Sequence, residues 1–367
     1  GIPDKGLYRA VQDALGKKRS QMFTEKEAAS LKKLEIPFRY KIGIKSLKGI
    51  EYLSNLERLD ISGYGLKSLK GIEKLPKLTS LVAEDNNLRN LQSVSKAKNL
   101  IGLYVGGNKL QSLKGIEGLK KLEYLGVQNN RLTTLKELKK LSKLKQLEVK
   151  ENKLKNLKGL ERHQKLDYLD ARCNDIKNLN AIKKLKKITY LDISYNELKS
   201  LEGLKCINSI KGLHASHNKL KTLPDLRKNE EIRVGSCNVE FNYLQEKEIK
   251  NKLPKRFFRK GKDREYHIGR LLYYQNIKEG MEFITPADGR ITKDTTQIIG
   301  RVHKEAEVRI KNRTKGIVLD PVKADENGVF VMEHLNFQAW AGDQIEFLYL
   351  GDLSEEFSLP KLTVLEK

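Results

Sequence analysis

Leucine, isoleucine and valine recur along most of this chain in one fixed frame that ends in an asparagine. One copy of the frame reads Leu122, Leu125, Val127, Asn130 and Leu132. Apolar residues at this spacing predict a short strand and a following bend that both point their leucines inward. The asparagine recurs every 22 residues, at Asn86, Asn108, Asn130, Asn152, Asn174, Asn196 and Asn218, and once more after 24 residues at Asn242.

A 22-residue period in the frame L-x-x-L-x-L-x-x-N-x-L is the signature of leucine-rich repeats. Each repeat contributes one short strand to a parallel sheet, and the stacked repeats bury a continuous core. The return path is too short for a full α-helix, so we expect 3₁₀ turns or extended segments on the convex side. The asparagine side chains should hydrogen-bond backbone groups of the neighbouring coil, because an unpaired buried amide or carbonyl costs roughly 1–3 kcal/mol.

Segments with other patterns flank the repeats. Helical spacing over Pro3–Leu15 and a capping box at Thr24 and Glu27 predict two helices, the second continuing through Leu34. After the repeats, Glu246–Leu253 looks helical, and the phenylalanines of a basic segment at 255–262 are predicted to cover the last coil; a nucleic-acid contact is the alternative interpretation. The predicted parts are a helical N-terminal cap at 1–38, the repeats with a C-terminal cap at 39–265, a connector at 266–280 and a β domain at 281–367.

The β domain is predicted from short β-rich runs that turn signals such as Ala341-Gly342-Asp343 separate. Six or seven short strands in about 85 residues suggest a sandwich of the immunoglobulin type. The predicted fold class is therefore an α/β leucine-rich repeat solenoid joined to an all-β sandwich. The predicted strands are Thr295–Val302, Ala306–Ile310, Gly316–Val322, Gly328–Met332, Gln344–Leu350 and Phe357–Val364.

The repeats resemble the 22-residue class found in the internalins of Gram-positive bacteria, and Ile2-Pro3-Asp4 ahead of a helical cap resembles the start of a mature internalin. The resemblance implies a secreted or surface-attached protein whose concave face binds a partner protein. A Leu-Pro-x-Thr-Gly sorting signal is not present in the sequence, so the mode of attachment stays open. The tail resembles the bacterial immunoglobulin-like modules that follow such repeats, in a frame of Gly300, Ala306, Val308, Ile310, Ala324, Asp325, Gly328, Phe330, Ala341, Gly342, Asp343 and Ile345.

The candidate binding surface is the concave face, which the outward-pointing strand residues form. This face is rich in tyrosine, a side chain that offers large contact area at low entropic cost. Its acidic excess predicts a basic or mixed partner surface, whose arginine or lysine would relieve the repulsion between Asp170 and Asp192. The alternative interpretation is that the rings merely stack on one another. The predicted binding residues are Tyr104, Tyr124, Glu148, Tyr168, Asp170, Tyr190, Asp192, Tyr195, His214 and His217.

The formal net charge of +25 admits a second function. Two lysine columns on the convex side predict binding to an anionic polymer such as teichoic acid, or to a membrane surface, unless they only form a solvated face. Nucleic acid is disfavoured because no aromatic platform accompanies the lysines. The two columns are Lys67, Lys155, Lys177, Lys199 and Lys221, and Lys77, Lys121, Lys143, Lys165 and Lys187.

No catalytic constellation, phosphate-binding loop or zinc motif occurs in the sequence, so we expect neither an enzyme nor a cofactor. His214 and His217, beside Asp192, are the one combination that could supply three metal ligands. Contact residues or solvated residues are the preferred interpretation there, and no metal is predicted.

Cys173, Cys206 and Cys237 fall in different columns of the repeat, so we expect no disulfide between them. Scarce cysteine also fits an intracellular scaffold, the third candidate function. His163 replaces leucine at a convex core position and is expected to be partly buried and hydrogen-bonded. No run of about 18 apolar residues exists in the sequence, so we expect no transmembrane helix.

Overall fold

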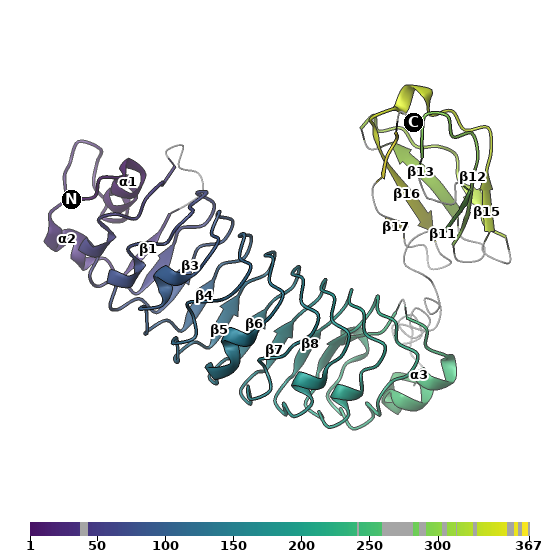
Figure 1. The fold of residues 1–367 in the computed structure, drawn as a ribbon, viewed down its shortest axis with the longest axis horizontal. Helices are drawn as coiled ribbons and strands as arrows, with labels where there is room; N and C mark the ends of the chain where they lie inside the picture. Colours follow the sequence, from purple (N-terminus) through teal and green to yellow (C-terminus); the bar gives the residue numbers. More distant parts are fainter. Residues whose placement is uncertain are drawn as a thin grey trace. The chain divides into compact units, whose positions relative to one another are not determined.

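The computed structural model of the 367-residue chain divides into two compact units, which are described separately (Figure 1). The repeat unit comprises Gly1–Val239 and Leu244–Ile268, and the β unit comprises Glu240–Tyr243 and Gly269–Lys367. The predicted connector at 266–280 lies outside the described residues, and the predicted domain boundaries stay predictions. The described residues are 1–36, 43–240, 242–258, 282–285, 291–302, 307–312, 314–325, 329–350, 356–358 and 362–365.

Two helices begin the repeat unit, as predicted, but the second is shorter than expected. Helix α1 (Lys5–Ala14) starts at Asp4, whose carboxylate accepts the Leu7 N–H at 2.9 Å. Helix α2 (Glu25–Ser30) starts at the predicted capping box of Thr24 and Glu27. The prediction that this helix continues through Leu34 is wrong. Leu34 instead lies in strand β1 (Lys33–Glu35), where it pairs in parallel register with Leu59 of the next coil.

The core of the repeat unit lies behind one parallel sheet of ten strands that follow one another in chain order. The strands are β1, then β2 (Arg58–Asp60), β3 (Ser80–Val82), β4 (Gly102–Tyr104), β5 (Tyr124–Gly126), β6 (Gln146–Glu148), β7 (Tyr168–Asp170), β8 (Tyr190–Asp192), β9 (Gly212–His214) and β10 (Cys237–Asn238). In β1 to β9 the central leucine points inward, as the repeat frame requires, and it lies opposite the leucine of the next coil; in β10 the inward residue is Cys237, opposite Leu213.

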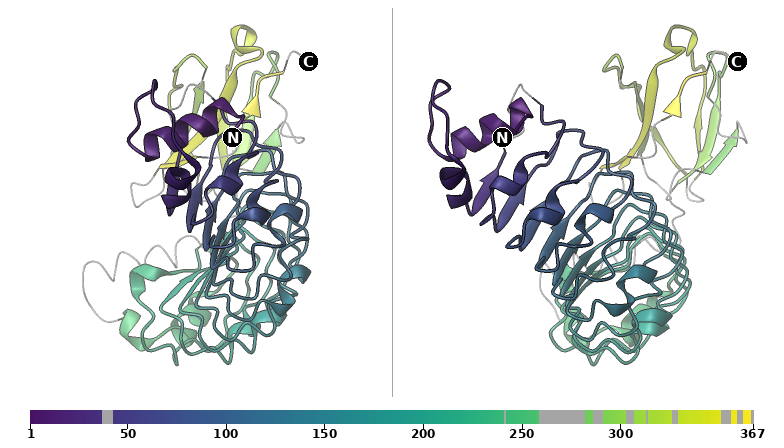
Figure 2. Two further views of the ribbon diagram at one scale, coloured as in Figure 1. Left: turned by 90° about the vertical axis from the view of Figure 1, so that its left-hand side faces the viewer. Right: turned by 60° about the vertical axis from the view of Figure 1, so that its left-hand side comes forward.

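Short 3₁₀ turns occupy the wall opposite the sheet, which confirms the prediction for the convex side (Figures 1 and 2). The leucines and isoleucines that precede and follow these turns are almost all fully buried, so each coil closes around a filled apolar interior. These turns are η1 (Ile50–Tyr52), η2 (Ile72–Lys74), η3 (Gln92–Val94), η4 (Lys136–Lys140), η5 (Asn180–Ile182) and η6 (Glu202–Leu204), whereas η7 (Val234–Ser236) lies directly before β10.

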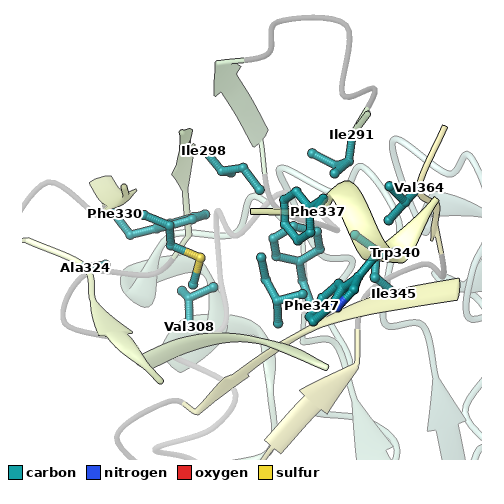
Figure 3. Packing of buried hydrophobic residues seen from close by; sticks show 12 residues of the cluster. Ile291, Ile298, Val308, Ala324, Phe330, Phe337, Trp340, Ile345, Phe347 and Val364 are labelled. Carbon is teal, nitrogen blue, oxygen red and sulfur yellow. The ribbon is translucent and has the colours of Figure 1, made fainter. Parts of the chain in front are cut away.

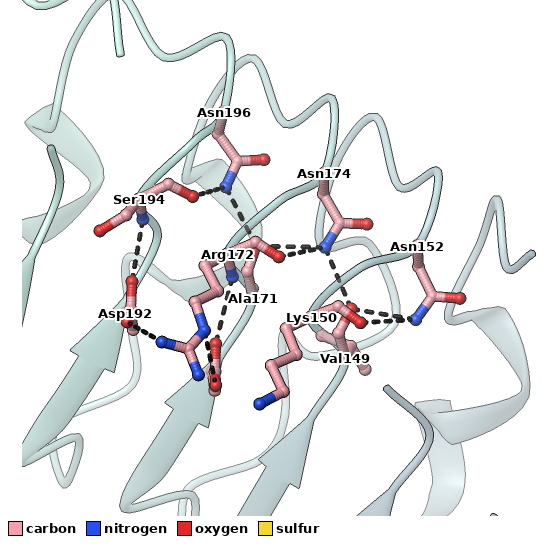
Figure 4. Close-up of polar contacts among 10 residues, drawn as sticks. Val149, Lys150, Asn152, Ala171, Arg172, Asn174, Asp192, Ser194 and Asn196 are labelled. Carbon is pink, nitrogen blue, oxygen red and sulfur yellow. Dashed lines mark hydrogen bonds and ion pairs between the residues drawn. The ribbon is translucent and has the colours of Figure 1, made fainter. Parts of the chain in front are cut away.

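The asparagines form a continuous polar ladder at the bends that follow β3 to β9 (Figure 4). Asn174 Nδ2 donates to the carbonyls of Val149 at 3.0 Å, Ala171 at 3.1 Å and Arg172 at 3.2 Å, while its Oδ1 accepts the Leu154 N–H at 3.0 Å. One side chain therefore satisfies backbone groups of its own coil and of the preceding one. The same pattern recurs at Asn108, Asn130, Asn152, Asn196 and Asn218, and Asn86 differs only in detail.

A buried histidine and three free cysteines depart from the leucine pattern. The His163 side chain is fully buried, so the expectation of partial burial was wrong. Neither ring nitrogen has a partner in good hydrogen-bonding geometry among the described residues, although the backbones of Leu160 and Leu138 lie close enough to oppose the effect of burial on its pKa. Burial lowers the pKa of His163, which therefore stays neutral and packs as a large apolar group. Cys173, Cys206 and Cys237 are all free, as predicted.

The last coil is capped by helix α3 (Glu246–Lys252) and turn η8 (Lys255–Phe258). Phe257 is fully buried, as the capping interpretation requires. Arg256 Nη2 donates to the backbone carbonyls of Asn229 and Ile232 at 3.1 and 2.5 Å. This basic residue therefore holds the C-terminal cap against the last coil. The rest of the predicted basic segment, 259–262, lies outside the described residues.

The β unit contains two antiparallel sheets with an apolar cluster whose members include Val308, Phe330, Phe337, Trp340 and Phe347 (Figure 3). One sheet has the order β11 (Glu282–Thr285), β12 (Ile298–Arg301), β15 (Val329–Met332). The other has the order β14 (Val322–Lys323), β13 (Glu307–Asn312), β16 (Gln344–Leu350), β17 (Glu356–Ser358), with β18 (Leu362–Thr363) also paired to β16. A short turn, η9 (Gln338–Trp340), precedes β16.

The predicted strands of the β unit are found with three exceptions. The predicted strand Phe357–Val364 is found as two short strands, β17 and β18, which both pair with β16. The predicted strand Gly316–Val322 is wrong over most of its length, because only Val322 lies in a strand, β14. Strand β11, which pairs with β12, was not predicted. Ala306 and Gly328 of the immunoglobulin-like frame lie outside the described residues.

Candidate functional site

The outward side chains of the ten-stranded sheet form two parallel columns, which we call the concave face. Register pairs Tyr168 with Tyr190 and Asp170 with Asp192, so residues predicted to be neighbours from the 22-residue spacing do face each other. The first column is Arg58, Ser80, Gly102, Tyr124, Gln146, Tyr168, Tyr190 and Gly212. The second column is Asp60, Val82, Tyr104, Gly126, Glu148, Asp170, Asp192 and His214.

Aromatic rings lie stacked along the C-terminal half of this face. The rings of Tyr168 and Tyr190 are parallel within 7° and 4.7 Å apart, and His214 is tilted against Tyr190 with centroids at 5.6 Å. Neighbouring glycines give the tyrosines room: a Cβ on Gly212 would lie 2.9 Å from Tyr190 Cδ2, and one on Gly126 would lie 3.0 Å from Tyr104 Cδ1. The sheet therefore holds half-buried rings in fixed positions before any partner arrives.

Tyr104, Tyr168 and Tyr190 keep their phenolic protons at physiological pH. Burial, with the nearby Asp170 and the ring of Tyr190, raises the pKa of Tyr168 to about 12. Burial also raises the pKa of Tyr104 and of Tyr190. Each of these hydroxyl groups is therefore available as a neutral hydrogen-bond donor as well as an acceptor.

An arginine of the same chain bridges the two central carboxylates (Figure 4). Arg172 lies 3.4 Å from Asp170 and 3.6 Å from Asp192, and both carboxylates are almost fully buried. The expectation that a partner's arginine or lysine relieves their repulsion was therefore wrong, because Arg172 already does so. Burial nevertheless raises the pKa of Asp170 to about 6, against the opposing effects of Arg172 and Lys150.

His217 and Tyr195 lie at the rim, after the strand ends. Their rings stack at 4.0 Å and 9°, and both backbones are left-handed, with φ of 55° and 54°. Burial lowers the pKa of His217 to about 4, so its imidazole is neutral at pH 7. His214 and His217 do not combine with Asp192 into a metal site: nowhere in the described parts of the chain do three potential ligands gather.

A hollow of about 370 Å³ lies at the N-terminal end of the concave face. The hollow forms because the small residues Ser80 and Gly102 lie in the first column between the large side chains of Arg58 and Tyr124. The sequence did not reveal this hollow, because its outer wall includes Glu35 of strand β1, a strand that was not predicted. The lining residues are Glu35, Arg58, Leu59, Asp60, Thr79, Ser80, Val82, Ile101, Gly102, Tyr104 and Tyr124.

A further contact that the sequence did not predict joins coils two repeats apart. Gln128 Nε2 donates to Glu84 Oε1 at 2.8 Å across the intervening coil. Gly106 makes this possible, since a Cβ there would lie 2.4 Å from Gln128 Nε2. In the sequence, the only sign of this contact was a glycine, Gly106, at an outward position just after a strand. A glycine does not specify which side chain fills the space beside it.

Comparison with known proteins supports the class of the fold. The family model for leucine-rich repeats in two copies matches residues 98–140. Among solved structures, the functional domain of InlJ from Listeria monocytogenes, which includes a cysteine ladder, is 16% identical with a TM-score of 0.54 and covers 99% of this chain and 97% of that one. An internalin (inlF) from Listeria monocytogenes is 21% identical with a TM-score of 0.50 and covers 68% of this chain and 85% of that one.

No curated protein sequence matches the chain. The repeats and the two structural similarities establish a leucine-rich repeat protein whose fold is similar to that of internalins. Its ladder consists of asparagines, and its three cysteines stand in separate columns. Among the described residues, no helix has the length and apolar character needed to cross a membrane.

Proposed function

We propose that this chain is a protein-binding module that recognises its partner through the concave face. The observation that carries the proposal is the row of half-buried rings, Tyr168, Tyr190 and His214, which the sheet holds ready for contact. Rigid aromatic side chains at the centre of a surface are the usual energetic anchors of protein interfaces. Because the receptor strands are already ordered, binding loses little entropy on this side.

The charge of the concave face indicates a basic or mixed partner surface. With Arg172 shared by Asp170 and Asp192, the face is less acidic at its centre than the sequence implied. Nearer the N-terminal hollow, Glu35 is paired with Lys33 at 2.6 Å, whereas Asp60 and Glu84 form no ion pair among the described residues. We place the partner's basic groups there and its apolar groups against the tyrosines.

We further propose that the protein acts outside the cell, either secreted or attached to a surface. The internalin-like fold of the repeat unit supports this placement. The two antiparallel sheets of the β unit support an immunoglobulin-like module, which would present the repeats to a partner.

A capture experiment tests the proposal. Immobilised wild-type protein should retain specific proteins from host-cell or bacterial surface extracts, and Tyr168→Ala/Tyr190→Ala should lower their affinity at least about tenfold. Tyr52→Ala, on the convex turn η1, is the matched control and should bind as wild type does. If the double variant keeps every partner while deletion of 281–367 abolishes capture, the β unit is the binding module instead.

A further inference from the structure

A column of lysines runs along one flank of the repeat unit, just before the inward leucine that precedes each strand. Its first members alternate with asparagine: Lys77 Nζ donates to Asn55 Oδ1 at 2.7 Å, and Lys121 Nζ donates to Asn99 Oδ1 at 2.6 Å. The next three coils depart from this alternation and carry Lys143, Lys165 and Lys187. Successive coils are about 4.8 Å apart at the sheet. Each of these lysines therefore has another lysine as its neighbour in the column, whereas in the earlier coils the neighbour is an asparagine that accepts a hydrogen bond.

A hollow of about 550 Å³ opens beside this lysine column. Lys145, Lys165, Lys186 and Lys187 line it, together with Asp167, Thr189 and Ser209. Four ammonium groups around one hollow repel one another unless acceptors neutralise them, and like charges on neighbouring strands destabilise the fold.

Among the described residues, the hydroxyl and carboxylate groups that line this hollow bond to one another or to the backbone, and none of them bonds to Lys165, Lys186 or Lys187. Asp167 Oδ1 accepts a hydrogen bond from the Thr189 hydroxyl, and the Ser209 hydroxyl donates to the Ile188 carbonyl at 2.7 Å. Lys145 is the one lysine of the four with a carboxylate, that of Glu123 at 2.7 Å. Within the described part of the chain, Lys165, Lys186 and Lys187 form no ion pair.

A second basic hollow, of about 350 Å³, lies near the first along the chain. Lys136, Lys139, Lys158 and Arg162 line it with Gly159 and Glu161. Its acidic group is also engaged, because Glu161 Oε2 accepts the Gly159 N–H at 2.9 Å. Arg162 of this hollow and Lys165 of the first are three residues apart, so one coil contributes to both.

We infer that this flank binds a linear phosphate polymer, independently of the concave face. Two hollows and a lysine column along the solenoid suit a chain of regularly spaced anions, whereas a single small anion would meet only one of them. Compact ammonium groups bind phosphate as point charges. Aromatic side chains are missing from the linings of both hollows, so the flank lacks the stacking platforms that single-stranded nucleic acids use.

The test compares two triple variants of the full chain that lose the same charge. Lys165→Ala/Lys186→Ala/Lys187→Ala removes three cations from the flank, and Lys177→Ala/Lys199→Ala/Lys221→Ala removes three exposed cations from another column. Binding to immobilised poly(glycerol phosphate) should weaken at least about tenfold in the first variant, with a shallower dependence on salt, and less than about threefold in the second. Tyr168→Ala/Tyr190→Ala should bind the polymer as wild type does, which separates this site from the concave face.

Three results would overturn the inference. If the wild-type protein does not bind the polymer at physiological salt, the site is excluded. If the two triple variants lose the same affinity, binding depends on the net charge of the protein and not on this flank. Parallel arms with heparin and with single-stranded DNA identify the ligand. If either binds more tightly than the phosphate polymer and loses affinity in the first variant, the flank selects that class of polymer and not the one inferred.

Discussion

The asparagine in the bend after strands β3 to β9 is the residue on which the stacking of the repeats depends most. Its amide group pairs with both kinds of backbone group in the bend, because it donates to as many as three carbonyls and accepts from one N–H. Both kinds of backbone group would otherwise be buried without a partner. This is why the ladder could be read from the sequence: the 22-residue spacing places the same amide in the same bend each time.

Removing one rung should therefore destabilise the protein. Asn130→Ala leaves the Leu110 N–H without its side-chain partner and removes one of the two amide donors to the Val105 carbonyl, and we expect the free energy of unfolding to fall by roughly 1–3 kcal/mol. Lys143→Ala, at an exposed position of the next repeat, should change it by less than about 0.5 kcal/mol. Urea unfolding of the two variants measures both values. Equal midpoints would contradict the role assigned to the ladder.

Asp170 should make stability depend on pH in an unusual direction. Its pKa of about 6 in the fold exceeds the ordinary value of 3.8, so between these values the folded protein holds a proton that the unfolded chain has released. This contribution is fully present below about pH 4 and is lost as pH rises to about 6. Compared with wild type, Asp170→Asn should gain on the order of 1 kcal/mol between pH 4 and pH 7, measured by urea unfolding at each pH. A constant difference between the two proteins would show that Asp170 titrates normally.

At the scale of elements, the repeats were predictable because one periodic pattern specifies strand, bend and return path together. The N-terminal cap shows where the pattern fails. Leu31 and Leu34 fit helical spacing, but Leu34 also fits the inward position of a strand, and pairing with Leu59 in the first coil decides between them. A three-residue strand has no periodicity of its own, so local sequence cannot reveal it.

The β unit shows the same limit. Strand β13 and strand β16 alternate clearly and were found, whereas most of the run at Gly316–Val322 has strand-like composition without strand pairing. Strand composition reflects burial and cross-strand packing, which depend on partners far away in the chain. Strand β11 was missed because Glu282–Thr285 offers four residues next to a proline and no alternation that stands out.

The columns of the candidate site were predictable for the same reason as the ladder, since residues 22 apart must become neighbours. The interactions within the columns were predictable only in part. Stacking of the rings was given as an alternative interpretation, and Tyr168 and Tyr190 do stack. The bridge from Arg172 to both carboxylates depends on side-chain rotamers, and the N-terminal hollow depends on β1. Sequence spacing specifies which residues can meet, while packing decides which of them do.

At the scale of the whole molecule, the chain separates its charges. It carries a formal net charge of +25, yet carboxylates and tyrosines gather on the concave face while exposed lysines crowd the other walls of the repeat unit. A basic partner is attracted to one face only, and an anionic polymer to another. The two proposals therefore predict two ligands that bind at the same time without competing.

Site-specific photo-cross-linking tests the central claim, that the concave face is the partner-binding surface, most directly. The photoreactive residue p-benzoylphenylalanine replaces Tyr124 or Tyr168 on the concave face, Tyr52 on the convex side, or exposed Val331 in the β unit. After incubation with the captured partner and irradiation, we expect adducts from positions 124 and 168 and none from 52 or 331. Adducts from position 52 or 331, with none from the concave positions, would contradict the account.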